Sequence, residues 1–150
     1  MKSYSIPVVK MIYVSDNISD RPSLRSSVDA VKVFRDSFDE GELGMQEFFK
    51  VAYLNRANKL IGIHTVSMGG TASTVVDLKI LFSGALTAKA ESIMLCHNHP
   101  SGNRMPSGVD DNLTRKIVTA AALLDLRVID HLILTPDADT YFSYLDEGRI

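Results

Sequence analysis

Apolar residues recur three and four positions apart in three stretches of the chain, a spacing that places them on one face of an α-helix. The first stretch begins at Ser26 or Ser27, each a good N-cap, and is expected to end near Gly41. The other two helices are predicted over residues 76–89 and 107–126. The side chains expected on the three buried faces are Val28, Val31, Phe34 and Phe38; Leu78, Leu81, Phe82 and Leu86; and Val109, Leu113, Ile117, Ala120 and Leu124.

Five shorter apolar runs, each bounded by turn residues, predict β-strands. They cover residues 46–54, 60–66, 92–96, 127–134 and 141–144. Strands interleaved with helices in this order predict an α/β or α+β sandwich.

The length of 150 residues is enough for one domain with its own core. Residues 26–150 are expected to form that single domain. Residues 1–25 are expected to be an N-terminal extension, within which residues 8–14 are a candidate for an extra strand.

The composition is that of a globular protein in water, with 45% hydrophobic and 23% charged residues. A net charge of −2 argues against tight binding to nucleic acid, which requires a basic face. No segment has the length of a membrane span or the pattern of a secretory signal, so the cytoplasm is the default expectation and no membrane partner is expected. The single cysteine, Cys96, allows no intrachain disulfide and is expected to be a small buried side chain.

Two histidines, His97 and His99, follow the predicted strand at residues 92–96. Side chains two apart on a strand point the same way, so both imidazoles are expected to face one site. Asp110 follows eleven residues after the second histidine. Imidazole and carboxylate together suit zinc, and three protein ligands leave a fourth position for water, which is the catalytic pattern.

The same region also has a structural interpretation. Ser107 followed by Asp110 three residues later resembles a capping box at a helix start. For Asp110 alone the cap is the better interpretation, and the preceding His-x-His motif favours the metal. The nucleobase deaminases, another zinc class, need a Pro-Cys-x-x-Cys pair that a chain with one cysteine lacks.

His97-x-His99 with Ser107 and Asp110, in the context His-Asn-His-Pro-Ser-Gly, resembles the metal motif of the JAMM (MPN/JAB) metallopeptidases. Within that superfamily it is most similar to the bacterial RadC-like branch, and the resemblance extends over residues 46–148. It implies a JAB/MPN-like three-layer sandwich with a mixed central sheet flanked by helices, similar to the cytidine deaminases. Residues 26–150 would be this domain.

The resemblance also implies roles. Zinc would be held by the two histidines and the aspartate, and Glu47 would exchange protons with the attacking water. Ser107 would donate to the oxyanion, and the substrate would be a peptide or isopeptide bond. From residue type alone, Glu47 is only a charge at a strand start, with Glu40, Glu42 and Glu91 as competitors.

The alternative function is a DNA-repair-associated or binding module that performs no catalysis, because RadC-like proteins have carried a DNA-repair label. The two remaining histidines, His64 and His131, are expected to be structural. A supporting role beside the metal is a weaker possibility for His131.

Overall fold

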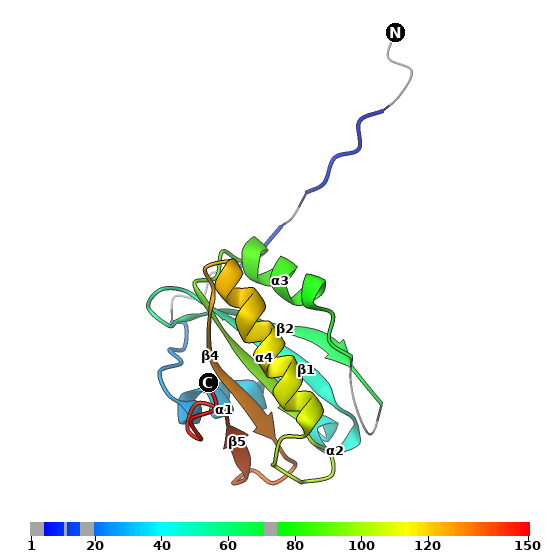
Figure 1. Ribbon diagram of the computed structural model, residues 1–150, viewed down its shortest axis with the longest axis vertical. Coiled ribbons are helices and arrows are strands. Elements are labelled where there is room, and N and C mark those ends of the chain that lie inside the picture. Colours follow the sequence, from blue (N-terminus) through cyan, green and yellow to red (C-terminus); the bar gives the residue numbers. More distant parts are fainter. Residues whose placement is uncertain (1–4, 11, 16–19, 71–74) are drawn as a thin grey trace.

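Five strands form one mixed sheet in the computed structural model, which describes residues 5–10, 12–15, 20–70 and 75–150 (Figure 1). The elements in chain order are α1 (Ser27–Asp36), α2 (Glu42–Met45), β1 (Phe48–Leu54), β2 (Leu60–Met68), α3 (Leu78–Thr87), β3 (Ser92–Asn98), α4 (Gly108–Leu123), β4 (Arg127–Leu134) and β5 (Tyr141–Ser143). The strand order is β2-β1-β3-β4-β5. Only β3 and β4 run parallel; the other neighbours are antiparallel.

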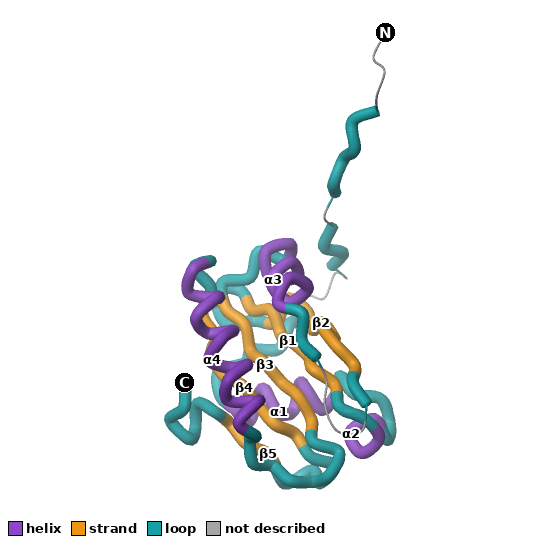
Figure 2. The backbone as a smooth tube through the Cα atoms, turned by 45° about the vertical axis from the view of Figure 1, so that its right-hand side comes forward, coloured by secondary structure: helices purple, strands orange, loops and turns teal. Residues whose placement is uncertain are grey.

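Helices cover both faces of the sheet, so the predicted three-layer arrangement with a mixed central sheet is confirmed (Figure 2). One face packs against α3 and α4 through residues such as Leu81, Phe82 and Ile117. The other face packs against α1 through Val31 and Phe34. Alternate side chains of β3 enter the two layers, which places Cys96 on the α1 side and the neighbouring His97 on the opposite side.

The helix α1 is shorter than predicted. Ser26 is its N-cap and accepts a hydrogen bond from the backbone N–H of Asp29, as the sequence indicated. The helix ends at Asp36 rather than near Gly41, and the Ser37 hydroxyl donates to the carbonyl of Phe34 at that end. The one-turn helix α2 follows, which the sequence pattern did not predict.

Four apolar residues assigned to buried helix faces are in fact exposed, so those assignments were wrong. Each lies in the first or last turn of its helix or just beyond it, whereas the residues that pack on the sheet lie nearer the helix centres. The central residues of α3 and α4 bury as expected. The exposed residues are Val28, Leu86, Val109 and Leu124.

The N-terminal extension contributes no strand among its described residues. Residues 8–10 and 12–14 are neither helix nor strand, and Met11 lies outside the described residues. Figure 1 shows residues 5–10 running away from the sheet. The contact of the extension with the domain includes Tyr13, whose hydroxyl donates to the carbonyl of Ile61 on β2 at 2.8 Å. No helix in the described part of the chain combines the length and apolar character needed to cross a membrane.

Candidate metal centre

The carboxyl end of β3 and the first turn of α4 bring His97, His99 and Asp110 together. One ligand atom from each residue lies within 4.8 Å of the others. The two Nε2 atoms are 3.0 Å apart. His97 Nε2 is 3.3 Å from Asp110 Oδ1, and His99 Nε2 is 3.3 Å from Asp110 Oδ2. These three residues form a triad that can bind a metal ion.

The spacing of the triad fits a small tetrahedral ion. Ligand atoms at 2.0–2.1 Å from a tetrahedral zinc are about 3.3–3.4 Å from each other. The three observed separations of 3.0–3.3 Å are close to that value. Small side-chain movements are therefore enough to hold such an ion, and the donor set of two imidazoles and one carboxylate suits zinc.

The proton position on His99 is fixed by the loop that follows it. Its Nδ1 lies 2.6 Å from the carbonyl oxygen of Asn103, which can only accept a hydrogen bond. Nδ1 therefore carries the proton, and the lone pair of the neutral ring is on Nε2, facing the triad. The loop is itself shaped locally, because Gly102 adopts a left-handed conformation with φ +85° and bonds back to the His99 carbonyl.

A chain of buried hydrogen bonds fixes the proton on His97 in the same way. Thr114 Oγ1 donates to the carbonyl of Asp110 at 2.7 Å, so it accepts from Nδ1 of His131 at 2.6 Å. Burial lowers the pKa of His131 well below its ordinary value, so the ring is neutral and its Nε2 is an acceptor. That Nε2 lies 2.8 Å from Nδ1 of His97. His97 therefore donates from Nδ1 and presents the lone pair of Nε2 to the triad.

Asp110 takes part in a helix cap and also faces the two histidines. The capping box is complete, since the Asp110 N–H donates to Ser107 Oγ at 3.1 Å and the Ser107 N–H donates to Asp110 Oδ2 at 2.8 Å. The first turn of a helix also favours a negative charge. The predicted capping box is confirmed, and the same carboxylate lies where it could also bind a metal ion.

The polar contacts in the site favour an ionised Asp110 beside the histidines. Burial would raise the pKa of Asp110, but the contacts of its carboxylate with the rings of His97 and His99 and the hydrogen bond from the Ser107 N–H outweigh burial and hold that pKa below its usual range. Burial would lower the pKa of His99, but the contact with the Asp110 carboxylate, the hydrogen bond to the Asn103 carbonyl and the charge of Glu47 outweigh burial and raise that pKa. Asp110 is therefore ionised, the state in which a carboxylate binds metal.

Glu47 and the triad line the same cleft, which has a volume of about 530 Å³. Glu47 precedes β1 rather than opening it, and its side chain is only 9% exposed. Its backbone exchanges hydrogen bonds with Gly69 and Gly70 at the end of β2. Ser107 lines the cleft as well, and because its oxygen accepts from the Asp110 N–H, its own proton is available to a ligand.

Asn98, between the two histidines, holds the segment that carries Glu47. Its side chain is fully buried and makes three hydrogen bonds to backbone groups. Oδ1 accepts from the N–H of Phe48 at 2.8 Å, and Nδ2 donates to the carbonyls of Gln46 and Leu43 at 2.9 Å. Asn98 therefore bonds to the residues on both sides of Glu47 and ties that acid to the histidine motif.

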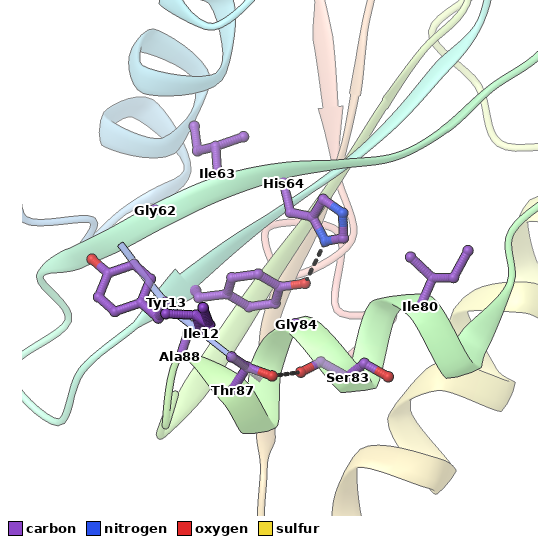
Figure 3. A pocket seen from close by; sticks show the side chains of 11 residues that line it. Ile12, Tyr13, Gly62, Ile63, His64, Ile80, Ser83, Gly84, Thr87 and Ala88 are labelled. Atoms are coloured by element: carbon purple, nitrogen blue, oxygen red, sulfur yellow. Dashed lines mark hydrogen bonds between the residues drawn. The ribbon is translucent and has the colours of Figure 1, made fainter. Parts of the chain in front are cut away.

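His64 lies outside this centre. It lines a separate cavity of about 440 Å³ between β2 and α3, where its Nδ1 is 3.0 Å from the Tyr53 hydroxyl (Figure 3). The same hydroxyl donates to the carbonyl of Leu81. Gly84 leaves the space for this pair, because a Cβ there would lie 2.1 Å from the Tyr53 oxygen. His64 thus packs against Tyr53 away from the triad, which agrees with the structural role expected from the sequence.

Three residues of the site were missed or undervalued from the sequence. Asn98 carried a signal, its place inside the His-x-His motif, whereas Thr114 carried none. His131 was expected to be structural, and the structure places its ring in direct contact with a ligand of the triad. Cys96 fulfils its prediction: it is fully buried on the other face, and burial raises the pKa of its thiol.

Known proteins are similar to this chain in sequence. The family model described as the RadC-like JAB domain matches residues 24–149. A UPF0758 protein of Flavobacterium johnsoniae is 40% identical over 134 residues, which cover 89% of this chain and 56% of the relative. A UPF0758 protein of Alkaliphilus metalliredigens is 31% identical over 157 residues, covering 100% of this chain and 66% of the relative.

A third relative, the UPF0758 protein YfjY of Escherichia coli, is 42% identical over 105 residues, covering 70% of this chain and 64% of the relative. The chain thus spans between about half and two thirds of the length of these three relatives.

Proposed function

The chain belongs to the RadC-like JAB domain family, and from this premise we propose that it is a zinc-dependent hydrolase of peptide or isopeptide bonds. The observation that carries the proposal is the convergence of two histidines and an aspartate with a nearby glutamate in one cleft. The membership itself supports a metal hydrolase of the JAMM type. The choice of zinc rests on the donor set and its spacing.

The triad side chains would bind the ion, with Nε2 of each histidine and a carboxylate oxygen of Asp110 as ligands. A zinc ion bound by these residues would supply Lewis acidity for a substrate carbonyl and would lower the pKa of water to about 7. His131 and Asn103 keep the histidine protons on Nδ1, so that both Nε2 atoms can act as ligands.

Glu47 supplies the proton transfers that peptide hydrolysis needs. Its carboxylate would take a proton from the attacking water and return it to the leaving amine. Its buried position in the cleft supports that role, as do the hydrogen bonds that Asn98 makes to Gln46 and Phe48 on either side. Ser107 would donate its free hydroxyl proton to the oxyanion that forms when water attacks the carbonyl.

Metal content is the first experiment. Protein purified without chelator should contain about one zinc per chain, and His97→Ala and Asp110→Ala should each lose it. Equal zinc in all three proteins would exclude this triad as the metal site. Zinc is released when histidines protonate, so the three proteins must be compared at one neutral pH.

Turnover is the second experiment, with a panel of peptides and isopeptide-linked peptides as substrates. Glu47→Gln should abolish cleavage while keeping zinc, because the amide preserves shape and cannot accept the proton. Glu91→Gln, at an exposed acid just before β3, is the matched control and should keep full activity. Full activity in zinc-loaded Glu47→Gln would remove Glu47 from the mechanism.

The same panel separates the proposal from its alternative. A zinc-loaded wild-type protein that cleaves no substrate would favour a binding module without turnover. The net charge of −2 gives little support to DNA as the partner of such a module.

A further inference from the structure

The apolar stripe of α4 continues past the protein core and into the metal cleft. Ile117 is fully buried and Leu113 is partly buried, but Val109, one turn earlier, is 77% exposed. Residues four apart lie on the same helix face, so Val109 extends this stripe toward the helix start. Both Val109 and Leu113 line the cleft that contains the triad.

The loop before α4 adds a second apolar wall. Met105 is 48% exposed, and it and Pro106 line the same cleft. The loop is fixed relative to the triad, since the Met105 N–H donates to Asn103 Oδ1 at 3.0 Å and the Asn103 carbonyl accepts from His99. A methionine at a binding surface adapts readily to different apolar partners.

The charges of the cleft disfavour acidic ligands. Its only ionisable side chains besides the two histidines are the acids Glu47 and Asp110, and the described lining residues include no lysine or arginine. A carboxylate of the substrate beside the metal would find no cationic side chain to pair with. An apolar side chain would cover Val109 and Met105 and remove their surface from water.

We propose that Met105, Pro106 and Val109 form a subsite for one apolar side chain adjacent to the scissile bond. The preferred substrates are therefore peptides or isopeptide-linked proteins with a residue such as leucine or methionine at that position. The inference rests on the proposed function, because the subsite has meaning only beside a working metal centre.

Hydroxamates test the subsite without requiring turnover, because the hydroxamate binds the metal and its substituent probes the walls. N-acetyl-leucine hydroxamate and N-acetyl-glycine hydroxamate probe the acyl side of the bond. The N-methylamides of isobutylsuccinyl hydroxamate and succinyl hydroxamate, which carry no free carboxylate, probe the amine side. In calorimetric titrations of the zinc-loaded full chain, at least one branched compound should bind about tenfold more tightly than its unbranched partner.

Val109→Ser should bring the two affinities of that pair to within about threefold. Val28→Ser is the matched control, because Val28 holds the same second position in α1, is 66% exposed and does not line the cleft. It should keep the full preference. Adding Met105→Ser to Val109→Ser tests whether the second wall contributes.

The outcomes separate the two proposals. If all four hydroxamates bind and neither pair shows a preference, the subsite is refuted and the metal centre stands. The subsite is also refuted if Val28→Ser and Val109→Ser reduce the preference equally. If no hydroxamate binds the zinc-loaded protein, the proposed function fails and the subsite fails with it.

Discussion

Replacing His131 tests whether it orients His97 for the proposed role as a metal ligand. The ring of His131 is fully buried and stacks on Tyr144, with centroids 4.9 Å apart and an interplanar angle of 10°. His131→Phe keeps a ring for this stacking and for the edge contact with Phe49. It removes the nitrogen that accepts from His97 and the one that donates to Thr114. The substitution therefore removes hydrogen bonds with little change in volume.

The cost falls mainly on the metal-bound form. To bind through Nε2, His97 must keep its proton on Nδ1, which in His131→Phe would be buried without an acceptor. Leaving a buried donor unpaired costs about 1–3 kcal/mol. In the metal-free protein His97 can avoid this cost by moving its proton to Nε2, which faces Asp110 at 3.3 Å. We therefore expect zinc affinity to fall about 10–100-fold, or about 1.4–2.7 kcal/mol.

Competition with a chromophoric chelator at neutral pH measures this affinity, and thermal unfolding on the same samples shows whether each variant is folded. His64→Phe is the matched control, since His64 is bonded to Tyr53 and not to the triad. His131→Gln should lose less than His131→Phe, because its amide oxygen can accept from His97. A folded His131→Phe protein with zinc affinity within twofold of the wild type would refute the orienting role.

Four further outcomes are expected. Ser107→Ala should lower the unfolding free energy by about 1 kcal/mol through the lost cap and also slow turnover; an unchanged rate would leave Ser107 only the cap. Gly84→Ala should lower the free energy of unfolding measured in urea by about 1–3 kcal/mol, because the added Cβ would displace the Tyr53 hydroxyl from its hydrogen bonds. Gly62→Ala should lower it much less, because there is open space around Gly62. Burial raises the pKa of Asp130 in the folded protein above its unfolded value of about 3.9. The stabilisation by protonated Asp130 is therefore fully present below about pH 3.9 and is lost as the pH rises through the folded pKa. Asp130→Asn should remove this pH dependence from unfolding curves. Duplex DNA should bind no more tightly than about 10⁻⁴–10⁻⁶ M at physiological salt, and nanomolar affinity in a titration would contradict this.

Local patterns in the sequence were sufficient for most of the fold and for the triad. Three helices and five strands lie where the periodicity of apolar residues predicts them, with ends shifted by a few residues. His97 and His99 could be placed together because side chains alternate along a strand. Asp110 could be placed at a helix start because a capping serine precedes it by a fixed offset.

Contacts between distant elements could not be read in this way. His131 meets His97 because β4 lies parallel to β3 and α4 crosses above both, bringing Thr114 onto the same ring. No local pattern encodes that register. The sequence did not predict the exposure of Val109, because periodicity identifies an apolar helix face and does not show which part of that face the sheet covers.

Asp110 shows why a cap and a metal ligand need not be alternatives. An ionised carboxylate has about four lone-pair sites, and the N–H of Ser107 uses one of them. The same hydrogen bond fixes the plane of the carboxylate, so that Oδ1 faces His97 and Oδ2 faces His99. A ligand held in this orientation before the ion arrives loses less conformational freedom on binding. The capping box therefore orients Asp110 toward the two histidines, and one serine–aspartate pair both starts the helix and completes the candidate metal site.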